Sequence, residues 1–242
     1  MNKSQSIGFG LVAIAAIFGS SSALAAENSP KVEVSTQAYS QYVNAVGARF
    51  SEDSYILGSA GVSYRGFSLK AAKLLPLAGG DGLAYKDDFR NEADYTAGYA
   101  KNLTEKVSLA VDVVHRDFIR KLAATEWSAE IGYEVVPGVT PFVRGTYVVL
   151  NKNGKDAAWY FAGAHVKQVA GKVNLNGTAE VFYDAGAYGM KSTYGYSLAF
   201  EPAVKLAENL AVNASFRLVG PFGEAVDRET EVVYGVGLTG TF

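Results

Sequence analysis

The side chains that could carry chemistry in this sequence of 242 residues are mostly acids and bases rather than nucleophiles. Histidine, the residue type that most often acts as a base near neutral pH, occurs twice, as His115 and His165. His115 precedes Arg116 and Asp117, with no serine two residues further on, and His165 has no nucleophile beside it. Cysteine is absent, which excludes disulfides and thiolate metal ligands. We therefore expect no catalytic residues, no metal site and no cofactor.

Charged residues recur instead at alternate positions of short segments that are otherwise apolar. Glu126 and Glu130, for example, alternate with Trp127, Ala129 and Ile131. Successive side chains of a β-strand point to opposite faces of the sheet. The pattern therefore predicts strands with one polar and one apolar face.

The same period of two runs through the chain after its first 30 residues and predicts twelve strands. They are 31–43, 54–65, 67–75, 92–101, 106–117, 125–135, 140–150, 157–168, 172–183, 192–201, 210–219 and 229–242. The connections alternate between short turns and longer loops, of which 76–91 is the longest. Proline is expected in these connections, as for Pro202, or at a strand start, as for Pro141, where a missing N–H is tolerated.

The first 25 residues have the features of a secretory signal peptide. Lys3 precedes an apolar run from Ile7 to Phe18, and the small residues end in Ala23-Leu24-Ala25. We expect cleavage there, which leaves residues 26–242 as one domain. The whole chain has a formal net charge of −2, and this acidic balance argues against a nucleic-acid partner.

No apolar run after this leader approaches the roughly 18 residues that a spanning helix needs. A membrane protein of this kind can only be a closed barrel, because backbone polar groups in lipid must pair within the sheet. Aromatic residues near both ends of the strands resemble the interfacial girdles of such barrels. They are Tyr42, Tyr55, Trp127, Tyr147 and Tyr194 at the loop end, and Tyr64, Phe67, Tyr99, Tyr133, Phe200 and Phe242 at the turn end.

We therefore predict an all-β fold, a transmembrane antiparallel up-and-down β-barrel of about twelve strands in the outer membrane of a Gram-negative bacterium. Its last strand carries one apolar face. That face consists of Tyr234, Val236, Leu238, Gly240 and Phe242. A soluble β-sandwich would also bury apolar strand faces, and the aromatic belts favour the barrel over it.

Particular stretches carry a resemblance to a known family. They are 61–68, 92–99 and Thr125-Glu126-Trp127, together with the terminal Phe242. In these the chain is similar to small Gram-negative outer-membrane porins, most closely to TorF-type porins. The resemblance implies passive diffusion of solutes and a last strand that closes the barrel and signals membrane insertion. Oligosaccharide-specific porins of twelve strands are a looser relative, and they line the pore with a basic track.

The predicted register places a mixed set of charges on the inward face. The charged residues expected to line the pore are Arg65, Lys70, Glu92, Asp94, Asp112, Arg116, Glu126, Glu130, Arg144, Lys167, Glu180, Arg217 and Glu231. In one interpretation an acidic wall faces the basic residues and gives an open, narrow pore a mild preference for cations. In the other, carboxylates and arginines pair across strands and fill the lumen as a structural network.

The function predicted is a porin-like channel for passive diffusion of small hydrophilic solutes through a narrow lumen. Its expected partners are outer-membrane lipid, lipopolysaccharide and, through the C-terminal strand, the barrel-assembly machinery. A structural, occluded barrel without transport is one alternative, and an outer-membrane hydrolase around His115 is another. The loop 76–91 either folds into the mouth or remains on the surface. Solvation is expected for the loop carboxylates Glu52, Asp53, Asp81, Asp87 and Asp88, with cations that bridge lipopolysaccharide as the alternative.

Overall fold

The computed structural model describes residues 29–43, 45–47, 49–51, 54–77, 92–118, 122–151, 156–186, 191–223 and 228–242. The expected signal peptide, residues 78–91 of the longest loop and the five loop carboxylates lie outside the described residues. No helix in the described part of the chain is long and apolar enough to cross a membrane.

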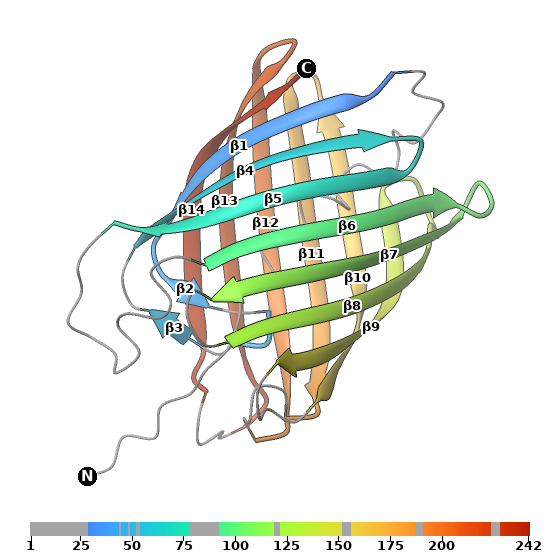
Figure 1. The fold of residues 1–242 in the computed structure, drawn as a ribbon. Helices are drawn as coiled ribbons and strands as arrows, with labels where there is room; N and C mark the ends of the chain where they lie inside the picture. The colour runs from blue at the N-terminus through green and yellow to red at the C-terminus, as the bar shows by residue number, and fades with distance from the viewer. Residues whose placement is uncertain are drawn as a thin grey trace.

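Twelve strands form one closed antiparallel barrel, which confirms the predicted fold (Figure 1). The barrel strands are β1 (Lys31–Tyr39), β4 (Tyr55–Tyr64), β5 (Phe67–Pro76), β6 (Glu92–Asn102), β7 (Val107–Phe118), β8 (Leu122–Tyr133), β9 (Val139–Asn151), β10 (Ala157–Ala170), β11 (Val173–Asp184), β12 (Thr193–Ala207), β13 (Leu210–Pro221) and β14 (Glu231–Thr241). A separate two-stranded sheet joins β2 (Tyr42–Val43) to β3 (Arg49–Ser51).

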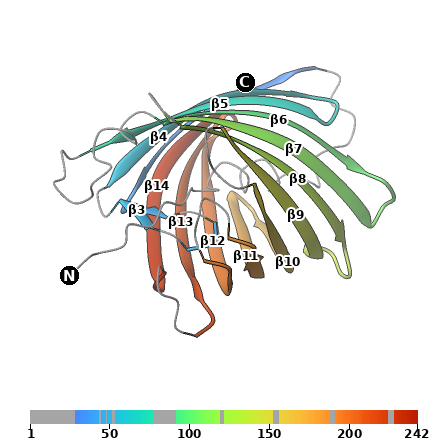
Figure 2. The same cartoon turned by 60° about the horizontal axis from the view of Figure 1, so that its bottom comes forward.

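Each barrel strand pairs with its neighbours in sequence, and β1 closes the sheet against β14. At the seam Val32 and Phe242 exchange two backbone hydrogen bonds of 2.8 Å. Closure leaves the sheet without an edge, as lipid requires. In Figure 1, β4–β9 form the wall nearer the viewer and β10–β14 the far wall. The turned view shows the two walls meeting through β9 and β10 (Figure 2).

The outward face is apolar and the inward face is largely polar. Leu69, Val143 and Val236 point outward with 61%, 56% and 58% of their surface exposed. Aromatic side chains such as Phe67, Tyr133, Tyr194 and Phe242 are also exposed. Tyr42 and Tyr55 do not belong to the outer girdle, because both are buried inside the barrel. There Tyr55 stacks on Tyr39 with ring centroids 5.0 Å apart.

Two predicted boundaries were wrong. The first strand ends at Tyr39, and Tyr42–Val43 turns inward to pair with β3 rather than extending β1. The strand β12 continues through Pro202, which was expected in a turn. Pro202 pairs with Leu175 of β11, while the β12–β13 ladder passes from Phe200 directly to Ala203. The missing N–H of proline explains this gap, because it removes one ladder hydrogen bond.

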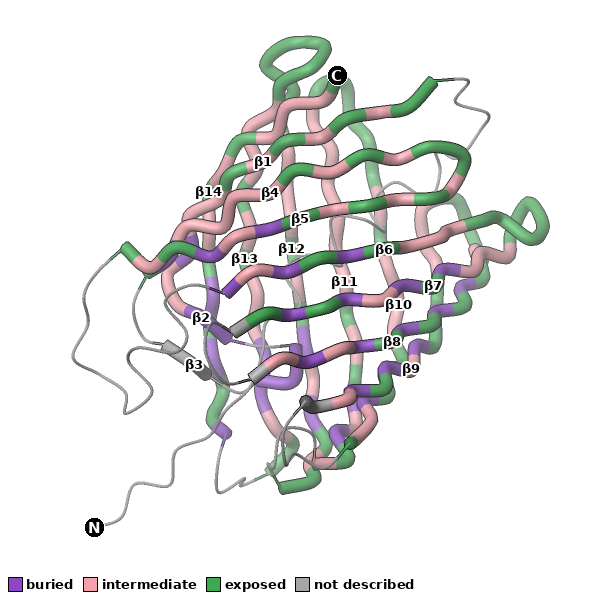
Figure 3. Tube along the Cα trace, in the orientation of Figure 1, coloured by how far each residue is buried: buried purple, intermediate pink, exposed green. Residues whose placement is uncertain are grey.

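The barrel has two chemically different ends. The turn end carries the short connections 65–66, 103–106, 134–138, 171–172 and 208–209, and the loop end carries the others. Buried residues lie largely along β6–β9 and around β2, whereas β1 and the turn-end parts of β10–β13 are mostly half-buried or exposed (Figure 3). The lumen is therefore more tightly packed toward the loop end.

Candidate functional site

The first cluster in the lumen surrounds Arg116, whose side chain is 1% exposed. Its guanidinium donates to Asp94 at 2.5 Å, to Glu126 at 3.1 and 3.2 Å, and to Glu92 at 3.4 Å. Asp94 and Arg116 are direct partners in the β6–β7 register, and Glu126 reaches them from β8. One cation thus holds three carboxylates that face into the barrel.

A second cluster surrounds Arg144 of β9. Its guanidinium contacts Glu180 at 2.9 Å and Glu130 at 3.5 Å, and lies 4.2 Å from the centroid of the Phe161 ring. Glu130 and Arg144 are direct partners in the β8–β9 register. Ion pairs therefore link neighbouring strands across the lumen wall. Their contacts are charge-assisted hydrogen bonds, which are stronger than neutral ones.

His165 extends this second cluster and has a partner that sequence reasoning missed. Nε2 lies 3.1 Å from Glu130, and Nδ1 lies 3.1 Å from the hydroxyl of Thr178 on the neighbouring strand. The imidazole also stacks on the ring of Phe142 at 4.2 Å. Both ring nitrogens and one ring face are thus occupied by the wall, an arrangement that suits a structural role. His115, in contrast, points outward and contacts Thr125 at 3.2 Å.

The segment 41–47, here called the inserted segment, enters the loop end of the lumen; its residue 44 lies outside the described residues. The hydroxyl of Tyr42 donates to Glu92 at 2.6 Å. Arg217 donates to the carbonyl of Val43 at 2.5 Å, and Arg228 to the carbonyl of Val46 at 3.4 Å. The inserted segment is thereby tied to β6, β13 and the residues before β14.

Arg228 also forms a buried ion pair with Asp184, the last residue of β11. Asp184 in turn accepts a hydrogen bond of 2.8 Å from the backbone N–H of Gly186. This pair therefore joins Arg228, which precedes β14, to the end of β11. Neither residue was among the predicted site residues, because both lie at strand ends where the period of two gives no signal.

Apolar side chains fill the space around the inserted segment. They belong to one cluster of inward residues that includes Tyr42, Val43, Val46, Tyr55, Val114, Val148, Trp159, Phe182 and Val219. Trp159 and Val114 are 0% exposed. The loop end of the lumen is therefore a packed core, with the Arg116 cluster along its wall.

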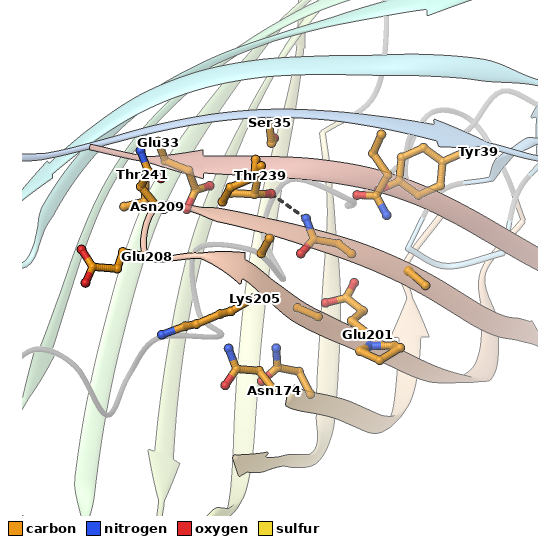
Figure 4. A pocket seen from close by; sticks show the side chains of 18 residues that line it. Glu33, Ser35, Tyr39, Asn174, Glu201, Lys205, Glu208, Asn209, Thr239 and Thr241 are labelled. Carbon is orange, nitrogen blue, oxygen red and sulfur yellow. Dashed lines mark hydrogen bonds between the residues drawn. The ribbon is translucent and has the colours of Figure 1, made fainter. Parts of the chain in front are cut away.

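The turn end of the lumen contains two cavities of about 280 and 380 Å³. Asn176 and Glu201 line both, so the cavities adjoin and form what we call the turn-end chamber. The first cavity is lined by side chains of β1, β11, β12, β13 and β14, among them Glu33, Asn174 and Lys205 (Figure 4). Polar and charged groups dominate the view, in contrast to the packed loop end.

The structure places most of the predicted pore-lining residues on the inward face. They are Lys70, Glu92, Asp94, Asp112, Arg116, Glu126, Glu130, Arg144, Lys167, Glu180, Arg217 and Glu231. Arg65 is misplaced in the prediction, because it forms the turn after β4 with a φ of 50° and lies over the Tyr64 ring. Glu231 accepts a hydrogen bond from Gln41, beside the inserted segment. Tyr234, Val236, Leu238 and Phe242 face outward.

The arrangement favours pairing over an open acidic wall. Five acids on β6, β7 and β8 were predicted to line the pore. Of these, Glu92, Asp94 and Glu126 bind Arg116, and Glu130 binds Arg144. The fifth, Asp112, is buried, and neither carboxylate oxygen has a hydrogen-bond partner among the described residues. Four of these five carboxylates therefore contact an arginine within the wall, which favours the paired network over a free acidic wall.

No protein-family model and no curated protein matches the chain. Among solved structures, the KdgM porin is similar with a TM-score of 0.59 and 10% identity, over 87% of this chain and 99% of that chain. The NanC porin gives 0.54 and 8% over 88% and 99%. An outer-membrane channel from Pseudomonas putida F1 gives 0.58 and 11% over 90% and 97%. The chain thus has the fold of outer-membrane barrel channels, and its outward apolar face suits the lipid of that membrane.

Proposed function

We propose that this chain is a porin-like channel of the bacterial outer membrane, through which small hydrophilic solutes diffuse passively. The observation that carries the proposal is a closed barrel with an apolar outer face and a chamber at the turn end of its lumen that is lined in part by charged and amide side chains. Similar barrels are named as porins, and one KdgM porin structure is a complex with disordered oligogalacturonate. Charged side chains of both signs face the lumen of this chain, whereas oligosaccharide-specific porins are expected to line the pore with a track of basic residues.

The finer parts of the proposal concern subfamily, export and assembly. The stretches 61–68 and 92–99 support a relationship to TorF-type porins. Residues 1–25 would be removed during export. The outward side chains Tyr234, Val236, Leu238 and Phe242 would present the last strand to the barrel-assembly machinery, and lipopolysaccharide would surround the loop end.

An occluded structural barrel is the second candidate, and one observation favours it. The inserted segment and the 0% exposed Trp159 fill the loop end of the lumen. A channel with this architecture has its narrowest point at the inserted segment and its widest at the turn-end chamber. The two candidates differ in whether solutes pass the inserted segment.

Solute-dependent swelling of proteoliposomes distinguishes the two candidates. The folded chain is placed in vesicles that are then diluted into isotonic solutions of sugars of increasing size. A narrow channel is expected to admit monosaccharides and to exclude large oligosaccharides, with rates that fall steeply as the solute grows. Vesicles that contain folded barrel but swell no faster than protein-free vesicles would reject the channel in favour of the occluded barrel.

A further inference from the structure

The turn-end chamber differs from the rest of the lumen in that several of its polar side chains have no hydrogen-bond partner among the described residues. Glu33, Asn174, Asn176, Glu201 and Lys205 line it, and none of their side chains forms a hydrogen bond or an ion pair with another described residue. Around Arg116, by contrast, three carboxylates contact a guanidinium group within the wall. Groups that line a cavity without protein partners remain available to water or to a solute.

Two further amides in this chamber are held in place by the wall. Gln37 donates from Nε2 to the hydroxyl of Ser215 at 3.0 Å. Asn213 donates from Nδ2 to the hydroxyl of Thr239 at 2.6 Å, and Figure 4 marks this contact beside the label of Thr239. An amide has two N–H donors and one carbonyl acceptor. Each amide therefore keeps one donor and its carbonyl for a solute, in an orientation that the wall fixes.

We infer that the turn-end chamber is a binding site for uncharged, hydroxyl-rich solutes, the chemistry of short neutral saccharides. A hydroxyl group donates and accepts at once, which matches amides and carboxylates placed side by side. The inference rests on the proposed function and names the solute class of the channel. A pore lined by a track of basic residues would instead select anionic saccharides.

The charged side chains of the chamber are the reason why we infer an uncharged solute. The carboxylates of Glu33 and Glu201 lie on different strands of the same cavity and disfavour an anion there. Lys205 lines that cavity as well. Lys70 interacts electrostatically with Glu33, and Arg217 with Glu201. The carboxylates are therefore offset, and a cation is not favoured either. An uncharged solute uses both signs, because carboxylates accept its O–H groups and the ammonium group donates to its oxygens.

Isothermal titration calorimetry on the full chain folded in detergent micelles tests this inference. Maltotriose is the neutral probe, a trimer of galacturonate the anionic one, and a trimer of glucosamine the cationic one. We expect maltotriose to bind at least about tenfold more tightly than either charged trimer. Each lost solute hydrogen bond weakens binding by about fivefold, so Asn174→Ala combined with Asn213→Ala is expected to weaken maltotriose binding by about 25-fold.

Two variants keep the test independent of folding. Asn174→Ala alone removes an amide that has no internal hydrogen bond to lose, and Asn102→Ala removes an exposed amide from the end of β6. The first is expected to weaken binding and the second to leave it unchanged. Tighter binding of either charged trimer, absence of maltotriose binding, or equal binding by the double variant would overturn the inference.

Bilayer recordings on the same preparation separate this inference from the proposed function. Conductance without maltotriose binding would reject the saccharide site and leave the channel standing. Maltotriose binding to a folded but silent barrel would support the site and reject the channel.

Discussion

Arg116 determines whether three carboxylates can remain buried on the lumen wall. Glu92, Asp94 and Glu126 all contact it, and Glu126 is 0% exposed. Breaking a buried pair by removing one partner leaves an uncompensated charge in a poorly solvated place. The cluster therefore stabilises the barrel as a unit.

Arg116→Met is expected to lower the free energy of unfolding by about 3–5 kcal/mol. The physical reason is the loss of a cation that all three carboxylates contact. Guanidinium unfolding of barrels folded in lipid vesicles measures the change. Arg65→Met is the matched control, because Arg65 is exposed in a turn, and it is expected to cost less than about 1 kcal/mol. A variant as stable as the parent would show that the cluster carries no stability.

Asp112 is the opposite case, since its buried carboxylate has no hydrogen-bond partner among the described residues. Asp112→Asn removes the charge at nearly constant size and is expected to raise the free energy of unfolding by about 1–3 kcal/mol. Asp94→Asn is the control, because that carboxylate contacts Arg116 at 2.5 Å and its loss is expected to destabilise. A destabilised Asp112→Asn would mean that the carboxylate has a partner, such as a bound water or ion.

The sequence predicts part of these contacts. Asp94 and Arg116 are direct cross-strand partners, and so are Glu130 and Arg144. Both pairings can be predicted by counting residues outward from the short turn that joins the two strands. His165 and Thr178 are also direct cross-strand partners, so their contact follows from the register. The residues next to His165 in sequence give no hint of it. Tyr42 and Glu92 are 50 positions apart and belong to different hairpins, so periodicity gives no hint of their contact.

Among the elements, the inserted segment sets the width of the lumen at the loop end. It is held by Glu92 through Tyr42, by Arg217 and by Arg228, which all lie far from it in sequence. These long-range ties explain why the sequence predicted a plain connection at 44–53. Both alternatives for the loop 76–91, folding into the mouth or lying on the surface, stay predictions, because residues 78–91 lie outside the described residues.

Replacement of residues 41–51 by a short Gly-Ser linker is expected to raise single-channel conductance several-fold, because it removes the apolar plug from the loop end. The same linker in place of 103–106, at the turn end, is the control and is expected to leave conductance unchanged. Planar bilayer recordings measure both. Equal conductance of the parent and the 41–51 variant would place the constriction elsewhere in the lumen.

The strands themselves were predictable because lipid and lumen impose opposite polarity on alternate residues along the whole chain. All twelve barrel strands lie where the period of two placed them, with differences at their ends. The exceptions have local causes. Pro202 continues a strand because the gap in its ladder accommodates the missing N–H, and Tyr42 leaves the first strand because its hydroxyl binds Glu92 inside the barrel.

Across the whole molecule, the lumen divides into a packed loop end and a polar turn-end chamber. Toward the loop end three carboxylates contact Arg116, whereas in the chamber the side chains of Asn174, Asn176 and Glu201 have no hydrogen-bond partner among the described residues. This division suits a channel that restricts passage at one end and contacts its solute at the other.

Single-channel recording of the full chain in a planar bilayer tests the channel most directly. Gel mobility before and after heating first establishes that the barrel is folded. We expect stable conductance steps of small and reproducible size, set by the inserted segment. Silence from a folded, correctly inserted barrel, in the parent and in the variant without residues 41–51 alike, would contradict the channel.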